Sequence, residues 1–98
     1  MIRWDYPPRC LSPHVSPAQS HCEALLWNAP SREGERTRLI TWTCDCGPVL
    51  FELHQAGGLR FIRRTARGQG GVSIAESDRW PAQEADAMWN ALLCGLVR

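Results

Sequence analysis

Lysine is absent from this chain, and all eleven basic residues are arginine. The glycine-rich run at residues 68–71 therefore lacks the lysine of a phosphate-binding loop, and no helix pattern follows it. A basic excess is missing as well, since the 98 residues carry a net charge of +1. Strong nonspecific binding to nucleic acid requires many neutralised phosphates, so this charge argues against it.

Long apolar stretches are also missing. None approaches the ~18 residues of a membrane span, and the first residues contain no apolar secretion segment. We therefore expect a cytoplasmic protein that makes no membrane contact. There its five cysteines stay reduced unless they bind a metal or do redox work. A chain of 98 residues, 44% hydrophobic and 21% charged, fits one domain with one modest core.

The N-terminal part divides into an arm and the start of a domain. Residues 1–15 hold three of the seven prolines and no apolar periodicity, so we expect an extended proline-rich arm before a single small α+β domain over residues 16–98. A short helix is predicted near residues 17–27, because Ser16 opens a Ser-x-x-Gln capping box. The alternative is a short strand over residues 23–27, paired with the strand after the next loop.

Period-2 alternation predicts an antiparallel sheet of three or four strands. The predicted strands span residues 37–46, 49–54, 59–65 and 72–75. In the first, Ile40 and Trp42 are expected on one face and Leu39 on the other. Gly57-Gly58 separates the second and third strands and indicates a hairpin.

The register of this hairpin is predicted from its apolar residues. Leu53 opposite Leu59 brings Phe51 opposite Phe61, which makes one face continuously apolar. A shift by one residue would mix the two faces. We therefore expect Phe51 and Phe61 on the same face.

Residues 81–93 predict the helix that packs against the sheet. Pro81 suits a first helical position, and apolar residues follow at helical spacing up to Gly95, where a helix commonly ends. This helix must cover one face of the sheet, since no other part of the chain is as apolar. The expected core is Leu25, Leu26, Ile40, Trp42, Phe51, Leu53, Leu59, Phe61, Trp89, Leu92 and Leu93.

Cys44-Asp45-Cys46-Gly47 is the strongest indication of side-chain chemistry. In an extended segment Cys44 and Cys46 point to the same side, so both thiolates could bind Zn²⁺, the candidate cofactor. A closed zinc site needs four ligands, and the others would come from Cys10, His14, His21 or Cys22. The alternative that we favour is buried thiols acting as small hydrophobic side chains. A redox Cys-x-Cys pair is the third interpretation.

Arginines cluster on and after the third predicted strand, at Arg60, Arg63, Arg64 and Arg67. Alternation sends them to both faces, so they do not form one basic stripe. We favour a solvated strand edge that discourages aggregation, with a protein contact or a nucleic-acid contact as alternatives. Together with Trp89, these arginines are the candidate interaction residues.

Three motifs of the chain are considered together. They are Cys44-x-Cys46-Gly47, the strand pair at 50–53 and 57–65, and the ending Trp89-x-x-Leu92-Leu93-x-Gly95-x-x-Arg98. This combination resembles a class of short actinobacterial proteins, similar to the BldB-type developmental regulatory proteins, over about residues 44–98. The resemblance implies a small dimeric regulatory or interaction protein with no catalytic residues. It does not extend to the candidate ligands upstream of residue 44.

Two functions from different classes follow. The first is a small non-enzymatic regulatory protein that acts through protein contacts, as a homodimer or with another regulatory protein. Five tryptophans are more than one small core needs, and exposed apolar patches commonly mark association surfaces. The alternative is a zinc-knuckle module that contacts nucleic acid through its arginine-rich strand. We expect no enzyme, because no nucleophile stands with a base in a recognisable pattern.

Overall fold

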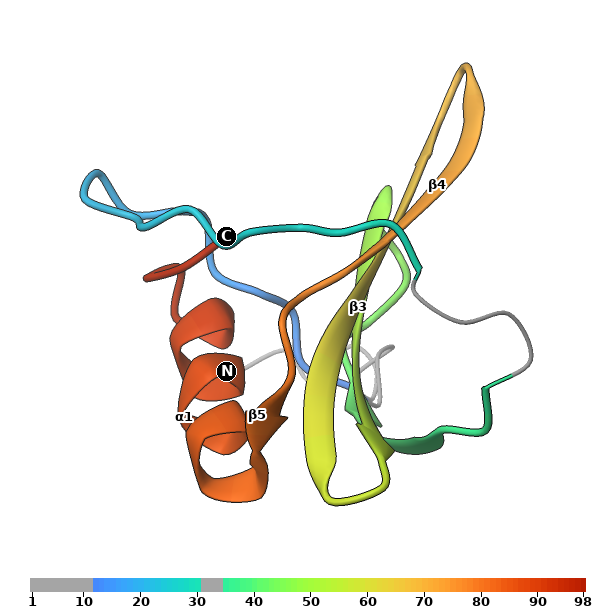
Figure 1. Cartoon of the computed structure of the whole chain (residues 1–98). Helices are drawn as coiled ribbons and strands as arrows, with labels where there is room; N and C mark the ends of the chain where they lie inside the picture. The colour runs from blue at the N-terminus through green and yellow to red at the C-terminus, as the bar shows by residue number, and fades with distance from the viewer. Residues whose placement is uncertain (1–11, 31–34) are drawn as a thin grey trace, which may run out of the picture.

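An antiparallel sheet with one helix packed against it makes up the fold (Figure 1). A computed structural model describes residues 12–30 and 35–98, so most of the predicted arm lies outside the described residues. Strands β1 to β4 neighbour one another in sequence order, and β5 pairs with the start of β3. The elements are β1 (Arg38–Trp42), β2 (Val49–Ala56), β3 (Leu59–Gly68), β4 (Gly71–Glu76), β5 (Trp80–Pro81) and α1 (Ala82–Leu93). The predicted α+β class is confirmed.

The Gly57-Gly58 turn sets the register of the β2–β3 hairpin. Ala56 pairs directly with Leu59, and Gly57 has a φ of 62°, a left-handed conformation that glycine adopts without strain. This two-residue turn lets pairing continue to the ends of both strands. The predicted register instead left residues 54–58 as a loop.

The predicted register is therefore wrong. Leu53 pairs with Ile62 rather than with Leu59, a shift of three residues, and an odd shift exchanges the faces. Phe51 now shares a face with Leu53 and Ile62, whereas Phe61 lies on the opposite face beside His54. We call the side of Phe51, Leu53 and Ile62 the core face, and the side of Phe61 the second face.

The core face packs against α1 and the last residues of the chain. Its buried cluster is Phe51, Leu53, Ile62, Ala85, Trp89, Leu92 and Val97. Leu25, Ile40 and Leu93 pack against this cluster and are partly buried, which agrees with the predicted core. Leu26, Trp42 and Leu59 do not belong to the core, because they are 66%, 46% and 41% exposed.

A bulge in β1 explains the exposed position of Trp42. The pairing of β1 with β2 shifts between Leu39 and Thr41, so strict alternation is interrupted there. Leu39 pairs with His54 and Trp42 with Glu52, which places both on the second face. Ile40 still packs against the core cluster. The predicted opposition of Leu39 and Trp42 is therefore wrong.

The predicted helix near residues 17–27 is not present. The segment turns at Ser20 and His21, and its backbone bonds to the end of the chain: the N–H of Ser16 donates to Leu93 at 2.8 Å and the N–H of Gln19 to Gly95 at 2.9 Å. Glu23 forms a parallel bridge with Val97. These distant partners satisfy the groups that a helix would have paired locally, so tertiary contacts override the capping signal. The alternative strand is also not formed as predicted, because its partner is not the strand after the loop.

Trp27 anchors this segment on the sheet. Its indole N–H donates to the carbonyl of Arg98 at 3.0 Å, and its ring centroid lies 6.1 Å from that of Phe51. The guanidinium of Arg64 lies over the indole, 4.6 Å from the ring centroid. Figure 1 shows the N-terminal segment running beside the red C-terminal end.

Substitution of Gly95 tests whether the docking of the N-terminal segment depends on its close approach to the end of the chain. Its φ is 78°, and a Cβ there would collide with the backbone carbonyl of Pro17. Gly95→Ala should therefore combine left-handed strain with a clash and lower the free energy of unfolding by more than about 2 kcal/mol. Urea unfolding followed by tryptophan fluorescence measures this loss.

Two other glycines serve as controls. Gly57 also has a positive φ but nothing within 4 Å of an added Cβ, so Gly57→Ala should cost only the strain, about 1 kcal/mol. Gly58 has neither problem, and Gly58→Ala should change stability by less than about 0.5 kcal/mol. Equal losses at Gly95 and Gly57 would contradict the role of the Pro17 contact.

Candidate functional site

Three candidate metal ligands meet where the N-terminal segment crosses the end of β1. The ligand atoms of His14, Cys44 and Cys46 all lie within 4.8 Å of one another. The Cys46 sulfur lies 3.3 Å from Nε2 of His14. This group could hold a metal ion.

Backbone contacts on both sides position this group. The N–H of Cys44 donates to the carbonyl of Pro13 at 2.8 Å, which brings the neighbouring His14 to the end of β1. The adjacent Thr43 is buried, and its hydroxyl accepts the N–H of Phe51 at 3.0 Å. Cys44 is thus tied to β2 through its neighbour and to the N-terminal segment directly.

The two cysteines approach each other through a turn. The N–H of Cys46 donates to the Cys44 sulfur at 3.4 Å, in the bend that precedes β2. β1 ends at Trp42, so the pair lies after the strand and not within the strand predicted over residues 37–46, although the same two side chains meet.

A hollow of about 240 Å³ opens beside the group. It is lined by His14, Val15, Cys44, Cys46, Gly47, Pro48 and Val49. Cys46 and His14 are exposed and Cys44 is half-buried, so the favoured interpretation of the two cysteines as buried thiols is wrong. A cation would therefore reach this group from solvent without a change of fold.

The other predicted ligands lie elsewhere. Cys22 is half-buried, and its sulfur contacts the carbonyl of Glu23 at 3.6 Å instead of joining the group. His21 is exposed and is not part of the group. Cys10 lies outside the described residues. Of the upstream candidates in the described chain, only His14 joins the two cysteines.

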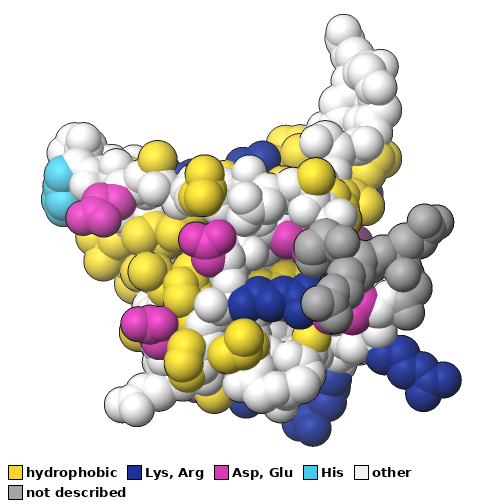
Figure 2. Space-filling view, viewed as in Figure 1, with side chains coloured by type: hydrophobic (Ala, Val, Ile, Leu, Met, Phe, Trp, Pro, Cys, Tyr) yellow, Lys and Arg dark blue, Asp and Glu magenta, His cyan; other side chains and the backbone are white. Residues whose placement is uncertain are grey.

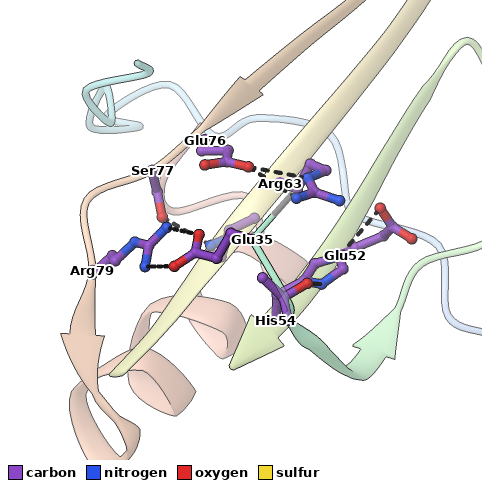
Figure 3. Close-up of polar contacts among 9 residues, drawn as sticks. Glu35, Glu52, His54, Arg63, Glu76, Ser77 and Arg79 are labelled. Atoms are coloured by element: carbon purple, nitrogen blue, oxygen red, sulfur yellow. Dashed lines mark hydrogen bonds and ion pairs between the residues drawn. The ribbon is translucent and has the colours of Figure 1, made fainter. Parts of the chain in front are cut away.

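The second face carries a polar cluster (Figure 3). Phe61 is fully buried there, with the His54 ring stacked on it at 5.5 Å between centroids. The guanidiniums of Arg79 and Arg63 lie 4.7 and 5.8 Å from the centroid of the same ring. Aromatic faces attract cations, so Phe61 is covered by charged groups rather than by a second hydrophobic layer.

Carboxylates balance these cations. Glu35 accepts two hydrogen bonds from Arg79, at 2.6 and 2.9 Å, and Glu76 accepts two from Arg63, at 3.0 and 3.2 Å. The hydrogen bond with Glu35 is the main reason that the pKa of Arg79 is raised. The sequence does not predict this cluster, because its members are distant in the chain and become neighbours only in the fold.

His54 is the titratable group at the centre of the cluster. Its Nδ1 lies 2.8 Å from the Thr37 hydroxyl, and its Nε2 lies 3.5 Å from a carboxylate oxygen of Glu52. Burial, followed by the charge of Arg63, lowers the pKa of His54, although Glu52 and Glu76 partly oppose the shift. Neutral imidazole is therefore the form that the fold favours.

The predicted interaction residues are placed in different environments. Arg60 pairs with Asp86 at 2.9 Å, Arg63 pairs with Glu76, and Arg64 stacks on Trp27. Arg67 is exposed and reaches the carbonyl of Asp45 at 3.5 Å. These arginines thus serve contacts within the chain and do not form a continuous basic surface. Trp89 is buried in the core and presents no ring to a partner.

Exposed apolar side chains instead gather on the second face. Leu39 and Trp42 lie at its β1 end, and Val72 and Ile74 at its β4 end. Figure 2 shows hydrophobic side chains at the surface near the base of the projecting hairpin. The signal that could have found these four residues is the hairpin register together with the bulge.

Comparisons with protein-family models, with curated proteins and with solved structures found no match to this chain. Within the described residues, no helix has the length and apolar character that a membrane crossing requires.

His54 should make stability depend on pH. Its pKa is lowered in the folded state, so the unfolded state binds more protons as the pH falls below the ordinary value of 6.5. Stability should fall as the pH drops from 6.5 toward the lowered pKa and then stop changing through this group. His54→Gln should flatten this part of the profile, measured by urea unfolding between about pH 7.5 and about pH 5. His21→Gln is the matched control, since His21 is exposed; identical profiles for both variants would contradict the assignment.

Proposed function

We propose that this chain is a small non-enzymatic interaction protein that acts through protein contacts as a homodimer. The observation that carries the proposal is two groups of exposed apolar side chains on the second face, with Leu39 and Trp42 at its β1 end and Val72 and Ile74 at its β4 end. No described helix or strand covers that face, whereas the core face is packed by α1. Exposed apolar groups collected on one face favour association, because burying them removes them from water.

Charge on the second face supports a protein partner rather than a polyanion. Its arginines Arg63 and Arg79 are matched by Glu76 and Glu35. Arginines paired in this way have little attraction for phosphates, and the apolar rim of the face supplies the area to be buried. The resemblance to BldB-type proteins agrees with this proposal and implies that the protein contacts are regulatory.

Substitution on the β4 end of the second face tests the homodimer. The parent chain should sediment as a dimer of 11.0 kDa subunits at micromolar concentration and dissociate on dilution. Ile74→Lys places a charge in the proposed contact twice, once from each subunit, and should weaken the dimer about tenfold or more. Analytical ultracentrifugation measures both dissociation constants.

Leu26→Lys is the matched control, since Leu26 is the more exposed of the two and lies in the N-terminal segment. It should leave the dissociation constant unchanged. Thermal unfolding should show both variants folded, because neither side chain is buried. A parent chain that stays monomeric up to about 100 μM would overturn the proposal.

A second function, Zn²⁺ binding, is favoured by the His14–Cys44–Cys46 group. Two sulfurs and one imidazole nitrogen are the donors that zinc prefers in tetrahedral sites. The ion would join the N-terminal segment to the end of β1, where one backbone hydrogen bond between Cys44 and Pro13 already joins them. The fourth ligand is water or Cys10, whose spacing from His14 suits a shared ion. The nucleic-acid role predicted alongside zinc has less support, because three of its arginines are engaged within the chain.

Metal analysis tests the zinc proposal. Protein purified without chelator should hold about one Zn²⁺ per chain, and chelation should lower the melting temperature because binding stabilises only the folded state. Cys46→Ser should lose the metal and the chelator effect, whereas Cys22→Ser and Cys94→Ser should keep both. Cys10→Ser distinguishes the two sources of the fourth ligand. Less than about a tenth of a zinc per chain would overturn the zinc proposal.

A further inference from the structure

Among the described residues, nothing bonds to the backbone groups of Val72 and Ile74 at the outer edge of β4. On one side of the chain, the N–H of Ser77 bonds to Ile62 of β3 at 2.9 Å. On the opposite side, the N–H and C=O of Glu76 bond to Asn28, each at 2.7 Å. Backbone groups alternate in direction along a strand, so the groups of Val72 and Ile74 point the same way as those of Glu76, away from β3. Among the described residues, β4 pairs only with β3 before Glu76.

This edge lacks the features that usually prevent pairing with another chain. Residues 71–75 contain no charged residue and no proline, and two of them are β-branched. Val72 and Ile74 are 64% and 45% exposed and project from the same face. The β3–β4 hairpin extends beyond the rest of the sheet, so a second strand can approach without meeting the helix (Figure 1).

We propose that the β4 strands of two copies of this chain pair antiparallel about a two-fold axis through Ser73, which forms one continuous sheet across the dimer. This inference rests on the proposed homodimer and specifies its geometry. The axis places Val72 opposite Ile74 of the partner subunit, so the free N–H of each residue donates to the free C=O of the other. Serine stands opposite serine at the centre.

The pairing is self-complementary in its side chains as well. Val72 and Ile74 lie on the second face, so the axis gathers both residues of each subunit into one apolar group. Moving the axis to Ile74 would require Val72 to pair with the partner's Glu76, whose groups already bond to Asn28. Asn28 therefore limits how far along β4 a second strand can pair. A second copy therefore pairs with the outer edge of β4 and covers Val72 and Ile74, whereas Leu39 and Trp42 lie on β1, outside this contact.

Cysteine cross-linking tests this register. Residues opposite each other in a non-hydrogen-bonded antiparallel pair have Cα atoms about 4.5 Å apart, within reach of a disulfide. Ser73→Cys should therefore give a covalent dimer under mild oxidation, seen on a non-reducing gel. Val72→Cys is the matched control, because the two copies of residue 72 would lie about 8 Å apart, beyond disulfide reach. A mixture of Val72→Cys and Ile74→Cys chains should cross-link to each other.

The parent chain, which carries all native cysteines, gives the background. Cross-linking of Ser73→Cys several-fold above both the parent and Val72→Cys would support the inference. A dimer in the ultracentrifuge without enhanced cross-linking of Ser73→Cys would overturn the edge pairing and leave the homodimer intact. A chain that is monomeric throughout would overturn the homodimer itself.

Discussion

The two-residue turn at Gly57-Gly58 is the constraint on which the other features depend. It pairs Ala56 with Leu59. Because side chains alternate between the two faces of a sheet, this register determines which side chains of β2 and β3 face the helix. In this register Phe51, Leu53 and Ile62 share the core face with the cluster built on α1. Phe61, although fully buried, is directed to the other side. One turn therefore separates a hydrophobic layer from a polar one.

The polar layer is the physical consequence of placing Phe61 on a face without a second helix. A buried ring needs a cover, and here His54, Arg63 and Arg79 supply it with their flat side chains. Charged groups near a buried ring lose hydration, so each arginine needs a carboxylate to remain stable there. Glu35 and Glu76 meet that need. Such paired groups add little net stability but disfavour other arrangements of the strands, since breaking one pair would leave a charge without a partner.

Local pattern predicts the helix from Pro81 onward and the second, third and fourth strands close to their observed bounds, because apolar periodicity and glycine turns act over few residues. The first strand ends at Trp42, four residues before its predicted end. The hairpin register, the bulge in β1 and the non-helical form of residues 17–27 depend on distant partners. The candidate metal group divides in the same way: Cys44 and Cys46 meet through their own bend, whereas His14 arrives through the bond between Pro13 and Cys44. Nothing within the segment itself distinguished His14 from Cys22, so that choice required the fold.

The N-terminal segment connects features that are far apart in the sequence. It begins beside the His14–Cys44–Cys46 group, pairs with the last residues of α1 and beyond, and ends where Asn28 closes the outer edge of β4 at Glu76. A cation bound at His14 would restrict the first end of this segment, and by mass action would favour every contact that forms only when the segment is docked. One of those contacts is the bridge between Asn28 and Glu76, which marks where the free edge of β4 ends. Metal binding and strand pairing thus act on opposite ends of the same segment, and any free-energy coupling between them must be equal in both directions.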